Sequence, residues 1–162
     1  MSKNLKYLKN GVADESGKIY GGTSVWFYKR IDGEIYLLFQ KRASSVHNGG
    51  FYDASAGGHI DEGESPLNCA IRETKEEIGA NVLPEDLEFL MSYVVGSKLC
   101  YLYISDRSDK NDNFTLDPEE VESIKWVPLS ELDKFWEDNI KPHLRVDWLH
   151  YNVLKYALTN LG

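Results

Sequence analysis

Hydrophobic and polar positions alternate along several short segments of the chain, a spacing typical of β-strands. The strands expected from this pattern cover residues 23–28, 35–40, 87–95, 99–104 and 124–127. Asp32 and Gly33 lie between the first two, and Asp-Gly between apolar runs predicts a tight hairpin. The run 35–40 is almost continuously apolar, which predicts a central strand of a sheet.

A helical spacing of apolar residues replaces this alternation between Pro66 and Ile78. Ser65 can accept a hydrogen bond at the N-cap, and Pro66 suits the first helical position because its missing N–H costs nothing there. Gly79 stands where a left-handed residue commonly ends a helix. We therefore predict a helix over residues 66–78.

Two further helices are expected near the C-terminus. Ser130 can cap a short helix from Glu131 to about Trp136, and a longer one runs from about Val146 to Thr159. In the longer helix we expect these residues to face inward: Leu149, Val153, Tyr156 and Ala157. Strands alternating with about three helices predict one α/β (α+β) domain over residues 1–162, with a mixed sheet flanked by helices. Residues 1–18 are polar and expected to be partly ordered.

The helix over 66–78 carries a second, acidic stripe formed by Glu73, Glu76 and Glu77. Like charges one turn apart repel, at about 0.2–0.5 kcal/mol a pair, and acids in the last turns face the negative end of the helix dipole. Hard divalent cations prefer oxygen ligands such as these carboxylates. The stripe alone leaves two interpretations open: a metal site or a solvated acidic face.

Composition narrows the classes of function. The 162 residues carry a net charge of −8, which argues against nonspecific binding to nucleic acid backbones. Cys69 and Cys100 form no CxxC pair, so neither a zinc site nor a disulfide framework is expected. MSKNLKYLKN has no apolar signal core, and no run approaches 18 apolar residues, so we expect a cytoplasmic protein without membrane spans.

The acidic stripe belongs to a longer spaced pattern. Gly58 is followed after five residues by Glu64, and after seven more by the run Arg72-Glu73-Thr74-Lys75-Glu76-Glu77-Ile78-Gly79-Ala80. The pattern resembles the box of the Nudix hydrolases, with seven fixed positions filled: Gly58, Glu64, Arg72, Glu73, Glu76, Glu77 and Gly79. Thr74 and Ala80 stand where larger aliphatic residues are usual. The resemblance implies a Nudix-type α/β/α sandwich and a hydrolase that uses Mg²⁺ or Mn²⁺.

The resemblance also implies roles for the box residues. Glu73, Glu76 and Glu77 would be catalytic and hold the metal, with the Gly58 carbonyl as a further ligand. Supporting roles in orienting these acids fall to Glu64 and Arg72. His59 follows the box glycine, and a ligand role for it stays open against that of a loop residue.

The general base has several candidates. It is either Glu73 in the box or a glutamate downstream, Glu119 or Glu120. For these two the structural alternative is the first turn of a helix after Pro118, where acids suit the helix dipole.

Three residues before the box are candidates for substrate binding. Arg42 can bind a phosphate, with a surface salt bridge as its alternative. Phe51 and Tyr52 can stack on a base, with core packing as the alternative.

The segment FQKRASS…GGFYDASAGGHIDEGES further resembles the branch that contains the isopentenyl diphosphate isomerases. Gly57 stands where the isomerases carry a catalytic cysteine, and residues 96–100 contain no acid for their second catalytic group. We therefore expect hydrolysis of a small-molecule diphosphate, in the form of a nucleoside diphosphate derivative. The alternatives are the isomerase and a catalytically silent ligand-binding Nudix domain. A homodimer is left open.

Overall fold

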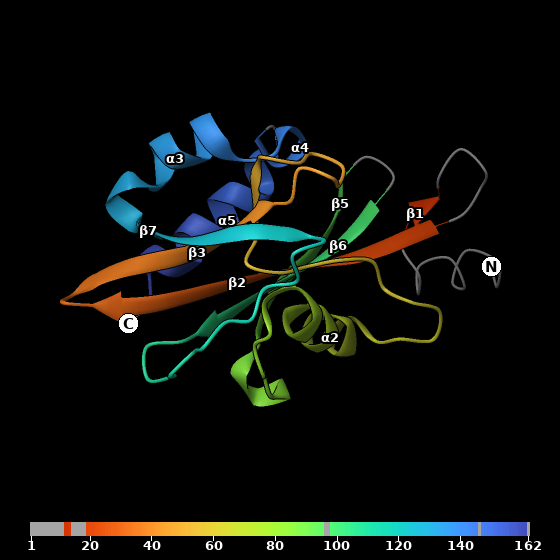
Figure 1. The fold of residues 1–162 in the computed structure, drawn as a ribbon, viewed down its shortest axis with the longest axis horizontal. Coiled ribbons are helices and arrows are strands. Elements are labelled where there is room, and N and C mark those ends of the chain that lie inside the picture. Colours follow the sequence, from red (N-terminus) through yellow and green to blue (C-terminus); the bar gives the residue numbers. More distant parts are fainter. Residues whose placement is uncertain (1–11, 14–18, 96–97, 146, 162) are drawn as a thin grey trace.

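The computed structural model describes residues 12–13, 19–95, 98–145 and 147–161 (Figure 1). Within these residues one mixed sheet has the strand order β4-β3-β2-β6-β5, with β1 paired to β2 and β7 paired to β3. The strands are β1 (Val12–Ala13), β2 (Ile19–Ile31), β3 (Glu34–Arg42), β4 (Tyr52–Asp53), β5 (Glu88–Val95), β6 (Lys98–Asp106) and β7 (Val121–Pro128). Strands β2 and β6 are parallel, and the other pairs are antiparallel. The predicted mixed sheet is confirmed.

The hairpin between β2 and β3 forms where Asp-Gly predicts it. Asp32 and Gly33 both adopt positive φ, 50° and 82°, which matches the right-handed twist of the two strands. Strand β3 pairs with β2, β4 and β7, and its residues 37–39 are fully buried. The prediction of a central strand is confirmed.

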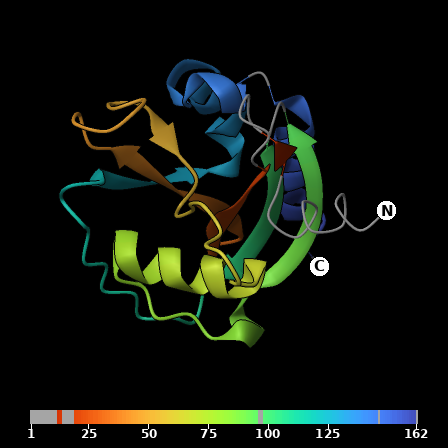
Figure 2. The same ribbon diagram turned by 90° about the vertical axis from the view of Figure 1, so that its right-hand side faces the viewer.

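Helix α2 spans Pro66–Ile78, as predicted, and covers one face of the sheet (Figures 1 and 2). Ser65 Oγ accepts a hydrogen bond from the Asn68 N–H at 3.1 Å. Gly79 takes φ 69°, and its N–H donates to the Lys75 carbonyl. The caps predicted from the sequence therefore set both ends of this helix.

The other face of the sheet is covered by α3 (Leu132–Asn139), α4 (Pro142–Arg145) and α5 (Trp148–Thr159), and short 3₁₀ turns lie at Pro84–Asp86 and Leu129–Glu131 (Figure 1).

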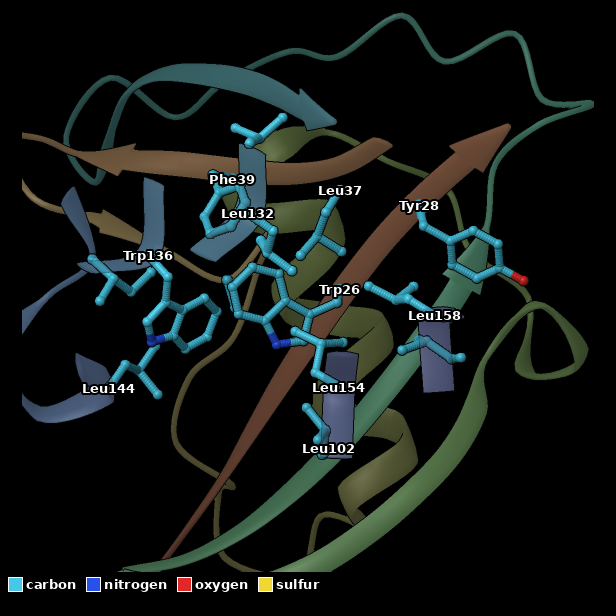
Figure 3. Close-up of a cluster of buried hydrophobic side chains, with 14 residues drawn as sticks. Trp26, Tyr28, Leu37, Phe39, Leu102, Leu132, Trp136, Leu144, Leu154 and Leu158 are labelled. Carbon is cyan, nitrogen blue, oxygen red and sulfur yellow. The ribbon is translucent and has the colours of Figure 1, made fainter. Parts of the chain in front are cut away.

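Each face has its own apolar cluster. Trp26 lies in the middle of the cluster under α3–α5 (Figure 3), where its Nε1–H donates to His150 Nε2 at 2.8 Å. Val25, Phe27 and Leu38 face the cluster under α2. This arrangement is the expected α/β/α sandwich.

Two details of the C-terminal helices differ from the prediction. Ser130 lies in a 3₁₀ turn and its hydroxyl bonds to Glu34, so it does not cap α3, which begins at Leu132. Helix α5 begins at Trp148 with Asp147 as N-cap, and Val146 lies outside the described residues.

The predicted inward face of α5 is also partly wrong. The buried residues are His150, Leu154 and Leu158, whereas Tyr156 is 71% exposed and Leu149 36% exposed. Val153 and Ala157 are partly buried against the core. Apolar residues occur on more than one side of α5, so their spacing alone does not select one face.

The expectation of partial order for residues 1–18 falls outside the described residues, except at 12 and 13. None of the helices in the described ranges has the length and apolar character that a membrane span requires.

Candidate active site

A cleft of about 520 Å³ opens beside the N-terminal half of β2. One wall comes from α2 and the loop before it, and the other includes Lys141, Leu144, Asp147 and His150. Thr23 and Ser24 of β2 lie between these walls, with Cys100 of β6 next to them in the sheet. The cleft therefore lies where α2 presents its acidic stripe.

The acidic stripe is not a solvated face. Glu73 and Glu77 are buried, at 9% and 3% exposure, and only Glu76 is exposed. Glu77 Oε2 accepts hydrogen bonds from Gln40 Nε2 at 2.7 Å and from the Gly57 N–H at 3.0 Å. Burial raises the pKa of Glu77 to about 8, because these two hydrogen bonds offset only part of the lost hydration.

The box glycine packs closely against the Glu73 carboxylate. A Cβ on Gly58 would lie 2.2 Å from Glu73 Oε1, so a larger residue would displace this carboxylate. The Gly58 carbonyl accepts a hydrogen bond from the Thr23 N–H at 2.9 Å. Burial raises the pKa of Glu73, and Arg72 counteracts this shift. The loop thus brings the Gly58 carbonyl and the Glu73 carboxylate into one small region.

Arg72 gathers three acids of the box. Its Nε and Nη2 donate to the two oxygens of Glu64 at 2.8 and 2.9 Å. Its Nη1 donates to Glu73 at 2.8 Å and to Glu76 at 3.1 Å. The paired hydrogen bonds from Arg72 lower the pKa of Glu64 to about 2. The guanidinium therefore offsets the repulsion between these acids.

The two downstream glutamates have different positions. Glu120 lines the cleft, whereas Glu119 does not. Residues 118–120 form a turn that leads into β7, and the Asp117 side chain accepts the Glu119 N–H at 2.9 Å. The expected alternative of a helical first turn is therefore wrong. The Asp117 N–H also donates to the Glu77 carbonyl, which fastens the turn to α2.

Arg42 is the predicted substrate-binding residue that does line the cleft. It contacts Asp53 Oδ2 through Nη1 at 3.2 Å and the His47 carbonyl through Nε at 2.8 Å. Phe51 and Tyr52 are not brought to the cleft. The Phe51 side chain is exposed to solvent. The Tyr52 ring packs on Phe135 of α3, with ring centroids 5.0 Å apart, because β4 directs it toward that helix.

Polar residues at the site beyond those expected from the sequence include Gln40, Asp53, Lys98 and Lys141. Lys141 forms an ion pair with buried Asp53 and, with Arg42, lowers the pKa of that carboxyl against the effect of burial. Burial, Lys98 and Lys141 lower the pKa of His59. Gln40 is recognisable in the sequence as a polar residue in an apolar run. The two lysines lie far from the box in the sequence, and nothing in their neighbouring residues indicates a place in the site.

The donor set suits a hard divalent cation in type, because it consists of carboxylate and carbonyl oxygens. Over the described part of the chain, no three His, Cys, Asp or Glu side chains are already arranged as a metal site. Arg72 forms ion pairs with both Glu73 and Glu76. Binding of a metal would require these two carboxylates to turn away from the guanidinium.

A mixed sheet between helical layers, with the Gly58–Gly79 box at the cleft, defines a Nudix-type domain. Residues 22–146 match the NUDIX domain family, and the chain belongs to this family.

Individual relatives agree with this assignment. An uncharacterised Nudix hydrolase of Clostridium acetobutylicum is 29% identical over 135 residues, a match that spans 78% of this chain and 65% of that protein. An isopentenyl-diphosphate Delta-isomerase of a Jannaschia species is 25% identical over 134 residues, covering 78% of this chain and 73% of that protein. The NUDIX domain of Shewanella oneidensis NrtR, solved with ADP ribose, has a similar fold, with a TM-score of 0.65, 20% identity, and coverage of 94% of this chain and 97% of that one.

Proposed function

We propose that this chain is a divalent-metal-dependent hydrolase that cleaves a diphosphate linkage in a nucleoside diphosphate derivative by attack of water on phosphorus. The observation that carries this proposal is the burial of Glu73 and Glu77 at the cleft, with Gly58 packed against Glu73. Local charge repulsion makes such a cluster costly, and its burial in a cleft is expected of a site that binds cations.

Mg²⁺ or Mn²⁺ would be held by Glu73, Glu76, Glu77 and the Gly58 carbonyl. The metal would neutralise the diphosphate and lower the pKa of the attacking water. Arg72 and Glu64 keep the carboxylates at this point of the cleft, and Gln40 orients Glu77 through its hydrogen bond.

Glu120 is the general base in this proposal. It lines the cleft from the turn before β7, and that turn is fastened to the end of α2. Glu73 is the alternative base, but in this proposal its carboxylate would be held by the metal. Glu120→Gln should lower kcat with little change in KM, whereas Glu119→Gln should leave both unchanged.

The isomerase alternative is disfavoured by packing as well as by residue type. A Cβ on Gly57 would lie 2.3 Å from the Thr23 carbonyl oxygen, so the cysteine of the isomerases does not fit this backbone. A nucleotide derivative is supported by the ADP ribose in the NrtR domain of the same fold. We place the enzyme in the cytoplasm, where such small molecules are found.

The test is a panel of ADP-ribose, nucleotide sugars, NADH, dinucleoside polyphosphates, oxidised dNTPs and prenyl diphosphates, each with Mg²⁺ or Mn²⁺. We expect hydrolysis of at least one nucleotide, lost in Glu76→Gln and Glu77→Gln. Hydrolysis that survives both substitutions would refute the proposed site. Interconversion of isopentenyl diphosphate without phosphate release would establish the isomerase, and binding without turnover would establish a silent domain.

A further inference from the structure

Among the residues with a described placement, four strong cations line the cleft, and three of them have carboxylate partners. Arg72 is held by acids of the box. Arg42 and Lys141 share the buried Asp53. Lys98 is different, because among the residues that the structure describes its ammonium forms no ion pair or hydrogen bond.

Lys98 is placed at the cleft by the start of β6. It is partly buried, and it pairs with Tyr20 of the parallel strand β2. A Cβ on Gly22 would lie 2.7 Å from Lys98 Nζ and 3.2 Å from the Gly58 carbonyl oxygen. The ammonium and this carbonyl are therefore both next to the same point of β2, at the end of the acidic box.

An ammonium that is partly buried loses hydration, and a carboxylate partner normally repays this cost. The chain has 26 acids against 18 basic residues, so potential partners are abundant. The three neighbouring cations have such partners, and within the described ranges Lys98 is the one of the four that has none. Its charge is thus available to an anion that enters the cleft.

We propose that Lys98 binds the substrate, as the residue that holds the phosphate of the diphosphate not held at the box glutamates. The inference rests on the proposed function for the identity of the anion. The diphosphate would extend from the Glu73 edge of α2 to the start of β6, with one phosphate at each end. Arg42 approaches the cleft from the end of β3, and the Lys98 contact would be additional to it.

The test uses methylenediphosphonate, a diphosphate analogue that is not hydrolysed, titrated calorimetrically into the Mg²⁺-saturated protein. We expect Lys98→Met to weaken its binding by about tenfold to a hundredfold, because a charge-assisted hydrogen bond is lost. Lys98→Arg should restore most of the affinity, which a purely structural role would not predict.

Lys75→Met is the matched control. Lys75 is exposed on α2 and does not line the cleft, and its loss changes the net charge by the same amount. The affinity of the Lys75→Met variant for the diphosphonate should stay within about twofold of the wild-type affinity, since exposed charges are screened by salt. Thermal unfolding of each variant establishes that the fold is intact.

Equal affinity of the wild type and Lys98→Met would overturn the inference, as would equal losses in Lys98→Met and Lys75→Met, or no diphosphonate binding by the wild type. A wild type that hydrolyses a nucleotide while Lys98→Met binds normally leaves the proposed function standing. A wild type that binds the diphosphonate through Lys98 but hydrolyses nothing refutes the proposed function and supports the inference.

Discussion

Glu77 makes the stability of the metal-free protein depend on pH in an unusual direction. Burial raises its pKa from 4.5 to about 8, so the folded state favours the neutral acid. Below the pKa that Glu77 has in the unfolded chain, its carboxyl is neutral in both states and the free energy of unfolding is at its full value. As the pH rises toward 8, Glu77 ionises more readily in the unfolded chain, and the free energy of unfolding falls. Glu73, whose pKa is also raised, acts in the same direction.

The size of the effect follows from the shift. One pKa unit corresponds to about 1.4 kcal/mol, so Glu77 alone should lower the free energy of unfolding by about 3 kcal/mol between pH 5.5 and pH 8. Glu64, with a pKa of about 2, stays ionised in the folded state throughout this window and adds little to the slope. The lowered pKa of His59 acts in the opposite direction, so a comparison of variants is needed to isolate Glu77.

Urea unfolding in EDTA at several pH values measures this dependence. We expect Glu77→Gln to remove most of the decrease and the exposed Glu76→Gln to retain it. Mg²⁺ should stabilise the wild type more at pH 8 than at pH 5.5, since a metal binds the ionised carboxylate. A wild type with no decrease, or a Glu77→Gln variant with the full decrease, would show that Glu77 is not buried as described.

Other substitutions test separate contacts. Arg72→Met should lower the free energy of unfolding by about 2–4 kcal/mol in urea, because several acids lose a common partner; an unchanged value would refute the ion-pair network. Gly57→Cys should cost at least about 1–3 kcal/mol through overpacking and confer no isomerisation in a prenyl diphosphate assay. Ser65→Ala should lower the free energy of unfolding by about 1 kcal/mol through loss of the N-cap. Gln40→Met should weaken Mg²⁺ binding measured by calorimetry, by about tenfold, because Glu77 loses the hydrogen bond that orients it; unchanged affinity would remove Gln40 from the site.

The parts of the fold with local signals were predictable from the sequence. Asp32-Gly33 determines its own turn, and Ser65 and Gly79 cap α2 through hydrogen bonds within a few residues. Ser130 shows the limit of such reasoning. Its hydroxyl finds Glu34, a partner 96 positions away, and that contact cannot be read from neighbouring residues.

The candidate site divides in the same way. The box residues lie on one helix and one loop, so their spacing predicts that they meet. Lys98 reaches the cleft because β6 pairs with β2, and Lys141 because its N–H donates to the Tyr52 carbonyl of β4. Tyr52 takes the alternative of core packing, and the direction of its ring depends on the pairing of β4 with β3, which lies outside its local sequence.

The central claim is that water attacks phosphorus at the box glutamates, and one measurement tests it directly. ADP-ribose and the other nucleotides of the panel are incubated with Mg²⁺ in oxygen-18 water and followed by phosphorus NMR. We predict cleavage of a diphosphate with oxygen-18 bonded to phosphorus in one product, and no cleavage by Glu77→Gln. The absence of cleavage of every nucleotide, or an undiminished rate in Glu77→Gln, would contradict the account.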